Sequence, residues 1–208
     1  MLESTTMSKP ALESAVSNRA PGRPRSEEAR KAILESTVAL LKKFGFSDLS
    51  IESIAAHAGV GKATVYRWWP NKAALVIDAF VSVVEAELRY PTAGPALSAF
   101  RAQMERWIPI FNSPLGKVIA AVIGAGQSDP EIIDAFRAHW VEPRRREARG
   151  LILQSVKAGE IRADLDSEII MDILYGPLYL RLMLQNRPLS LELIDEIFSV
   201  VLPGLRPQ

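Results

Sequence analysis

The chain has 208 residues, of which 48% are hydrophobic and 24% are charged, as in ordinary globular proteins. It contains no cysteine, which excludes disulfides, thiolate nucleophiles and cysteine-ligated metals. No apolar run reaches the roughly 18 residues that a membrane span requires. We therefore expect a cytoplasmic protein of one or two small domains that does not enter a membrane.

The net charge of +1 is distributed unevenly. Residues 19–72 hold ten lysines and arginines against five acidic residues, so this segment carries +5 and the remainder carries −4. A basic segment of this kind indicates an anionic partner at the N-terminal part of the chain. A solvated surface has the same composition, so charge alone leaves both interpretations open.

The N-terminal elements are helical. Residues 1–20 are polar, lack the apolar stretch of a signal peptide, and are expected to form a disordered tail. A first helix over 26–44 begins at a serine with two glutamates in its first turn and ends at a glycine. Two short helices over 50–57 and 62–68 follow, the second ended by a proline. A fourth helix over 71–89 begins at an asparagine cap.

The remainder of the chain is also helical, because alternating strand patterns and Asn-Gly or Asp-Gly hairpin turns are nearly absent. Proline, glycine and capping residues divide it into five further helices. These cover residues 95–111, 115–123, 129–157 with a kink at Pro143, 166–186 with an interruption at Gly176 and Pro177, and 190–202. The prediction is an all-α fold in two parts with a seam near residues 90–95.

The two short helices have the spacing of a helix-turn-helix motif. Ala55 is small where the helices cross, Gly59 supplies the positive φ of the turn, and Val60 with Val65 packs the second helix on the first. A generic helical hairpin satisfies the same spacing. Either arrangement needs the flanking helices to complete its core.

Residues 26–80 resemble the DNA-binding domain of the TetR family of transcriptional regulators. The resemblance rests on "ILESTVALLKKFGFSDLSIESIAAHAGV" followed by "GKATVYRWWPNKAAL". It implies a helix-turn-helix domain over 21–70 that includes a basic arm, a linking helix over 71–90, and a ligand-binding and dimerisation domain over 91–208. It also implies a homodimer on a double-stranded DNA operator, with its N-terminal domains in successive major grooves.

The resemblance further implies which side chains contact DNA. Lys62, Ala63 and Thr64 fall at the exposed start of the recognition helix, where lysine donates to guanine and the methyl groups meet thymine. Phosphate contacts fall to Ser50, Tyr66, Trp68 and Lys72.

Three neighbouring positions need separate treatment. Trp69 matches a position that packs between helices. Arg67 has two equally weighted interpretations, a phosphate contact or an intramolecular ion pair. Glu52 departs from the family pattern, because some members carry a basic residue that touches DNA there.

A basic arm precedes the first helix. Pro24 holds Arg23 and Arg25 extended, as in arms that insert into an A·T-rich minor groove. The competing interpretation is a disordered basic linker, and we favour the groove-binding arm because it adjoins a DNA-reading fold.

Aromatic and methionine side chains in the second half are candidates for a ligand pocket, although core packing is the favoured interpretation for any one of them. The predicted set is Met104, Trp107, Phe111, His139, Trp140, Tyr175, Tyr179 and Met183. The only histidines, His57 and His139, lie in different predicted domains, so neither a metal site nor a cofactor is expected. The arginines of 143–149 are expected to form a solvated face.

The sequence thus predicts a transcriptional repressor that a small apolar ligand releases from its operator, and that dimerises through its last two helices. Repression, as opposed to activation, is not determined by the residues. No constellation of acid, base and nucleophile indicates an enzyme. The alternatives are a helical protein that binds small molecules, or an adaptor that binds proteins, without DNA binding.

Overall fold

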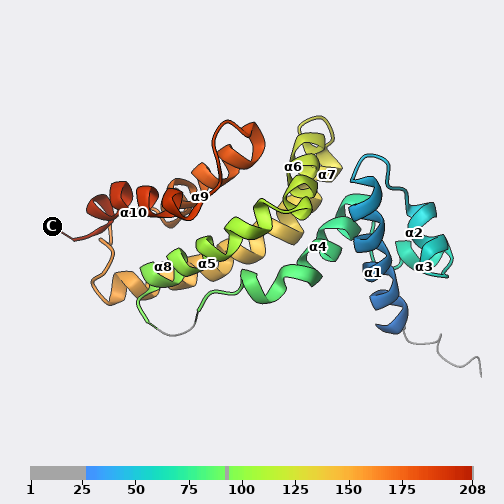
Figure 1. Ribbon diagram of the computed structural model, residues 1–208. Coiled ribbons are helices and arrows are strands. Elements are labelled where there is room, and N and C mark those ends of the chain that lie inside the picture. Colours follow the sequence, from blue (N-terminus) through green and yellow to red (C-terminus); the bar gives the residue numbers. More distant parts are fainter. Residues whose placement is uncertain (1–26, 92–93, 208) are drawn as a thin grey trace, which may run out of the picture.

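A computed structural model describes residues 27–91 and 94–207, which form helices and no strand, confirming the predicted all-α fold (Figure 1). The helices are α1 (Glu27–Phe44), α2 (Ile51–His57), α3 (Lys62–Tyr66), α4 (Lys72–Leu88), α5 (Ala96–Phe111), α6 (Pro114–Gly126), α7 (Pro130–Phe136), the π-helical segment η1 (Arg137–Val141), α8 (Glu142–Lys157), α9 (Ser167–Leu184) and α10 (Leu191–Leu205).

Helices α2 and α3 lie at one end of the molecule beside α1 (Figure 1). Gly59 has a φ of +67°, which permits the tight turn between the two short helices. Ile33 of α1, Ile54 of α2 and Val65 of α3 are fully buried, so the three helices share one core. The helix-turn-helix arrangement is therefore completed by α1, as its short elements require.

Helix α4 connects this end of the molecule to the rest. The Asn71 side chain caps it by accepting a hydrogen bond of 2.9 Å from the amide of Ala74. Nearly every position from 73 to 80 is buried, because α4 packs on α1 along one side and on α5, α7 and η1 along others. Val83, further along the same helix, is 46% exposed.

The long helix predicted over 129–157 is present, but its irregularity differs from a simple kink. Residues 137–141 widen into a π-helical turn immediately before Pro143. Proline has no N–H to donate and its ring crowds the carbonyl four residues earlier, here that of His139, so a wider turn accommodates both effects. The helix is therefore irregular near Pro143, as predicted, and the irregularity is a π-helical turn.

The interruption predicted at Gly176 and Pro177 is wrong, because α9 continues through both residues to Leu184. Packing of α9 against α8, α10 and α6 holds the helix together. At the corner between α5 and α6, which meet at 93°, Gly116 lies against the backbone of Phe111.

Within the described residues, no single helix is both long and apolar enough to cross a membrane. Only the bent pair of α5 and α6 passes that test of length and composition.

Candidate DNA-binding surface and ligand pocket

Helix α3 presents two different faces. Val65 is completely buried and Trp69, just beyond the helix, is 1% exposed, so this side belongs to the core as predicted for Trp69. Lys62, Ala63 and Tyr66 point away from the core and are exposed. These three predicted contact residues are therefore accessible to a partner, whereas Thr64 is half-buried.

An ion pair joins the two helices of the motif on the exposed side. The ammonium of Lys62 donates to the carboxylate of Glu52, and this hydrogen bond is the main cause that lowers the pKa of Glu52. Sequence reasoning identified both residues but missed their contact, since ten positions separate them. In the free protein, Glu52 thus pairs with the Lys62 ammonium, the cation that is expected to contact a base.

The remaining predicted contacts near α3 have distinct surroundings. Ser50 caps α2, its hydroxyl accepting from the Ser53 amide at 3.1 Å while its own amide donates to the Ser53 hydroxyl at 3.3 Å. Arg67 donates to the hydroxyl of Thr64 at 3.1 Å and forms no ion pair with the described residues. Of its two interpretations, the intramolecular ion pair is therefore not formed, and the phosphate contact stays a prediction.

Trp68 and Trp69 are adjacent in sequence but differently placed. Trp69 donates its indole N–H to Asp78 of α4 at 2.8 Å. Trp68 is half-buried, and the Arg30 guanidinium lies 5.7 Å from the centre of its ring. A phosphate contact by Trp68 remains a prediction.

Lys72 ties the start of α4 to the loop between α1 and α2. Its ammonium donates to the carbonyls of Phe46 and Leu49, both at 3.0 Å. Partial burial lowers its pKa. Two of its three N–H groups are therefore engaged within the protein, which leaves one for the predicted phosphate. The predicted contacts of Arg23 and Arg25, and the tail over 1–20, lie outside the described residues.

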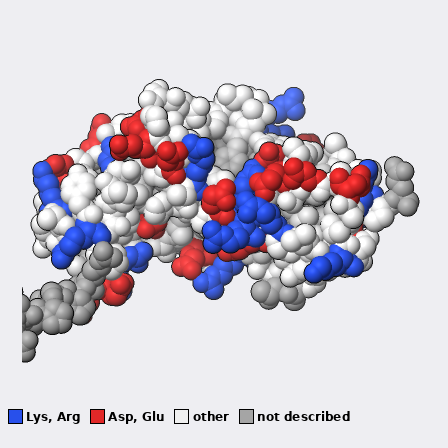
Figure 2. Space-filling view, turned by 180° about the vertical axis from the view of Figure 1, so that it is seen from behind, with Lys and Arg blue, Asp and Glu red and all other residues white. Residues whose placement is uncertain are grey.

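The surface charge forms no continuous basic area on one face of the molecule. On the face drawn in Figure 2, lysine and arginine side chains lie beside aspartate and glutamate over most of the molecule. This face therefore offers DNA no broad basic surface.

A cavity of about 300 Å³ lies among α5, α6, the segment from α7 to α8, and α9, and Tyr90, two residues beyond α4, also lines it. Four of the eight predicted pocket residues line it: Trp107, Trp140, Tyr175 and Tyr179.

The other four predicted residues lie elsewhere. Met104 is completely buried in the core. Phe111 forms a second layer, its ring 5.3 Å from Trp107 and 5.8 Å from Tyr179. His139 points to α4, and Met183 is half-buried outside this cavity.

Sequence reasoning missed several lining residues. These are Tyr90, Ile123, Phe136, Val141, Arg144, Arg145, Ala148, Met171, Asp172 and Gly176. Phe136 and Ala148 share helical spacing with Trp140, four residues before and eight after it, so a face-by-face reading of 136–148 could have identified them. Arg144 and Arg145 were assigned to a solvated face, which is wrong for both.

Hydrogen bonds connect the cavity wall to the linking helix. The Tyr175 hydroxyl donates to the Gln103 side-chain oxygen at 2.5 Å and lies 2.9 Å from the Tyr90 hydroxyl. Since the Tyr175 proton is used on Gln103, Tyr90 is the donor between the two hydroxyls. Burial raises the pKa of Tyr90 to about 12, so both phenols are neutral and the chain of donors is intact at neutral pH.

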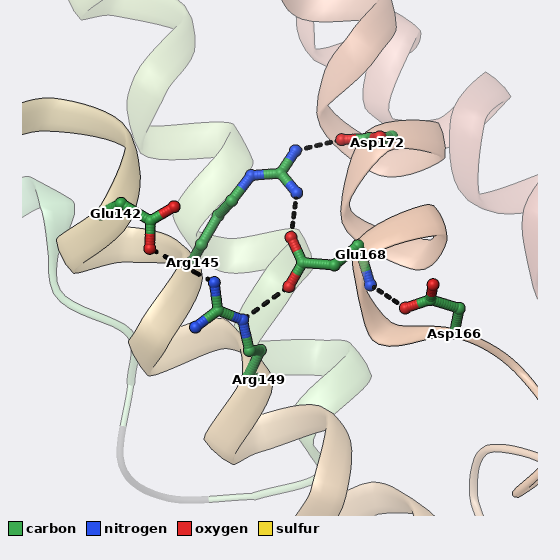
Figure 3. Close-up of polar contacts among 6 residues, drawn as sticks. All are labelled: Glu142, Arg145, Arg149, Asp166, Glu168 and Asp172. Atoms are coloured by element: carbon green, nitrogen blue, oxygen red, sulfur yellow. Dashed lines mark hydrogen bonds and ion pairs between the residues drawn. The ribbon is translucent and has the colours of Figure 1, made fainter. Parts of the chain in front are cut away.

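Ion pairs fix one rim of the cavity (Figure 3). Arg145 of α8 bridges Glu168 and Asp172 of α9, and Arg149 bridges Glu142 and Glu168. These arginines lower the pKa of Glu168 through their hydrogen bonds. The cluster clamps α8 to α9.

Asp78 joins the helix-turn-helix region to the segment beside the cavity. One carboxylate oxygen accepts from Trp69, and the other lies 2.9 Å from the Nδ1 atom of His139, in the π-helical turn. Arg30 of α1 lies 4.0 Å away. Because His139 precedes the cavity-lining Trp140, a single side chain of α4 contacts the segment after α3 and the segment beside the cavity. No group of metal ligands occurs among the described residues.

A helix-turn-helix with an exposed recognition helix, attached to a helical domain, is the architecture of a DNA-binding transcriptional regulator. Residues 33–79 match the family model of bacterial regulatory proteins of the tetR family, and residues 90–201 match the model described as tetracyclin repressor-like, C-terminal domain. The chain belongs to the TetR family of transcriptional regulators, as the sequence resemblance implied.

Named relatives agree with this assignment. The chain is 38% identical to the HTH-type transcriptional regulator YdeS of Bacillus subtilis, over 89% of this chain and 93% of the relative. It is 28% identical to the DNA-binding transcriptional repressor TetR of Mycobacteroides abscessus, over 88% and 98%. The crystal structure of the TetR family transcription regulator SCO0332 superimposes with a TM-score of 0.76 at 30% identity, over 86% of this chain and all of that one.

Proposed function

We propose that the protein is a homodimeric repressor whose affinity for a double-stranded DNA operator falls when a small molecule binds in the aromatic cavity. The observation that carries this proposal is the position of Asp78 between Trp69 and His139. The name of the M. abscessus relative supports repression. A gel shift with the DNA upstream of the gene is the direct test, and no specific shift at moderate salt contradicts it.

Two further contacts support coupling between the cavity and α4. The Trp140 ring lies 4.9 Å from that of Phe80, in the middle of α4, with its edge toward the neighbouring ring. Tyr90, two residues beyond α4, lines the cavity itself. A ligand that moves Trp140 or Tyr90 therefore acts on α4 directly, and the shift in DNA affinity is limited by the ligand's differential affinity for the two conformations.

Lys62 carries the first prediction for DNA binding. Lys62→Ala is expected to weaken operator binding by about tenfold and to reduce the preference for operator over random DNA, because a base contact contributes to both. The measurement is a titration of both DNAs by fluorescence anisotropy. Lys117→Ala, on α6 in the other half of the molecule, is the control and should bind as the wild type does.

Glu52→Gln complements this experiment. The amide retains the side-chain shape but removes the negative charge that holds Lys62 in the free protein. Binding to both DNAs should therefore strengthen at low salt, most visibly for random DNA. If Lys62→Ala leaves the affinity for both DNAs unchanged, α3 does not present Lys62 to DNA.

The proposed dimer uses α9 and α10. Four apolar residues of α9 are exposed at spacings of four, seven and four: Ile169 (54%), Ile173 (47%), Leu180 (54%) and Leu184 (62%). This spacing places them on one helix face, and Leu191 and Val200 of α10 are also exposed. Such a stripe is typical of a protein interface.

The expected solution mass is twice the 22.9 kDa of the chain. Sedimentation over a dilution series measures it. A protein that remains monomeric at micromolar concentration contradicts dimerisation through this surface.

A further inference from the structure

Arg144 is a cation whose partners are incomplete. Its guanidinium lies 3.8 Å from the centre of the Trp140 ring and donates one hydrogen bond to the Trp140 carbonyl. Its Nε atom is buried and has no acceptor among the described residues. Burial lowers the pKa of Arg144 to about 10, which still leaves the group charged at neutral pH.

The other charged residues of the cavity do not compensate Arg144. Arg145 and Asp172 are paired with each other, and Arg145 also binds Glu168. Glu147 lies on the same helix as Arg144 and lines a neighbouring groove, but no ion pair joins the two within the described part of the chain. The wall therefore carries one positive charge without a counter-ion, a state that is costly unless a bound anion neutralises it.

A second donor is also unused in this wall. Trp107 is 3% exposed, lines the cavity, and has an indole N–H without an acceptor among the described residues. By contrast, the indole N–H of Trp140 donates to the Tyr179 hydroxyl at 2.6 Å. Buried donors without acceptors are rare, and in a binding site they indicate that the ligand supplies the acceptor.

The shape and walls of the cavity restrict the rest of the ligand. Trp107, Trp140, Phe136, Tyr175 and Tyr179 surround it with ring faces and edges, which favour a flat aromatic molecule. Its volume of about 300 Å³ is at the lower end of ligand sites and suits one or two fused rings.

We propose that the effector of this regulator is a small planar aromatic carboxylate, whose carboxylate binds Arg144 and whose ring lies among the aromatic walls. Trp107 supplies a further N–H for an acceptor of the same ligand. This inference rests on the proposed function and replaces the purely apolar ligand expected from the sequence.

The test compares 2-naphthoate with 2-naphthamide, which has the same ring system without the charge. Both are titrated into the full-length protein without DNA, by calorimetry. The carboxylate should bind about 10- to 100-fold more tightly, the range expected for charge-assisted hydrogen bonds in a buried site. This comparison uses the wild-type protein and does not depend on the folding of any variant.

Arg144→Met should abolish the preference for 2-naphthoate while it changes the affinity for 2-naphthamide little. Arg146→Met is the matched control, because Arg146 lies on the same helix and is exposed, and it should keep the wild-type preference. Circular dichroism confirms that both variants fold.

Equal affinities of the wild type for the two probes, or no binding of either at millimolar concentration, overturn the proposal. So does an Arg144→Met protein that folds and retains the preference. A specific operator shift together with any of these results leaves the proposed function intact and rejects only the aromatic carboxylate. If the protein gives no specific operator shift but still prefers the carboxylate, the proposed function is rejected and the proposal of an aromatic carboxylate ligand stands.

Discussion

Replacing Gly116 by alanine is expected to destabilise the folded protein by about 3 kcal/mol, the upper end of the usual cost of overpacking. A Cβ atom at this position would lie 2.6 Å from the carbonyl carbon of Phe111 and 2.7 Å from its Cα, and closer still to its carbonyl oxygen. Backbone atoms cannot rotate away as a side chain can. The corner between α5 and α6 must therefore open, which displaces Phe111 from the aromatic layer behind the cavity.

Gly124→Ala, on the same helix α6, is the matched control. A Cβ atom there meets nothing within 4 Å, and the residue is exposed. Alanine is favoured over glycine in a helix, so this variant should be more stable than the wild type by about 0.5–1 kcal/mol. Urea denaturation followed by circular dichroism measures both. A Gly116→Ala protein as stable as the wild type would show that α5 and α6 do not meet as described.

Replacing Asp78 by alanine is expected to cost about 1–3 kcal/mol of stability, because the buried Trp69 indole loses its acceptor. The loss also separates His139 from α4. Operator binding should become less responsive to a ligand in the cavity, since one of the contacts that join the two regions is gone. Thermal unfolding measures the first effect. Glu87→Ala, at an exposed position of the same helix, should change stability by no more than about 0.5 kcal/mol.

A double-mutant cycle separates the two arms of Asp78. Asp78→Ala and His139→Ala should show a coupling of about 0.5–3 kcal/mol, as expected for residues in direct contact. Asp78→Asn preserves an acceptor for Trp69 and should retain more stability than Asp78→Ala. Strict additivity of the alanine variants would argue against an energetic link through Asp78.

Local chemistry allowed the sequence to predict most element boundaries. Ser50 and Asn71 are caps whose hydrogen bonds span only three residues, and Gly59 takes the positive φ that its turn needs. Gly176 and Pro177 show where local rules fail, because packing against three neighbouring helices maintains α9 across both residues.

The side-chain contacts that sequence reasoning missed join residues distant in the chain. The pair of Glu52 with Lys62 and the contacts of Asp78 depend on how helices cross, which periodicity does not specify. Arg144 illustrates the same difficulty for burial. It lies within a run of arginines typical of a solvated face, yet the wide turn before it and the ring of Trp140 place it in the cavity wall. Four of the eight residues predicted from aromatic and methionine spacing line the cavity, but the spacing did not predict that the charged Arg144 does so too.

The π-helical turn at 137–141 sets the angular phase between the two helices that it joins. It accommodates one residue more than a regular turn. A chain shorter by one residue here would continue as an uninterrupted α-helix, and because the wider turn already absorbs the extra residue, α8 would keep nearly the same rotation. Arg144 would then stay in the cavity wall and Arg145 beside its acids on α9. A one-residue deletion in this turn is therefore expected to change the cavity lining only locally, within 137–141, and to leave the faces of α8 as they are.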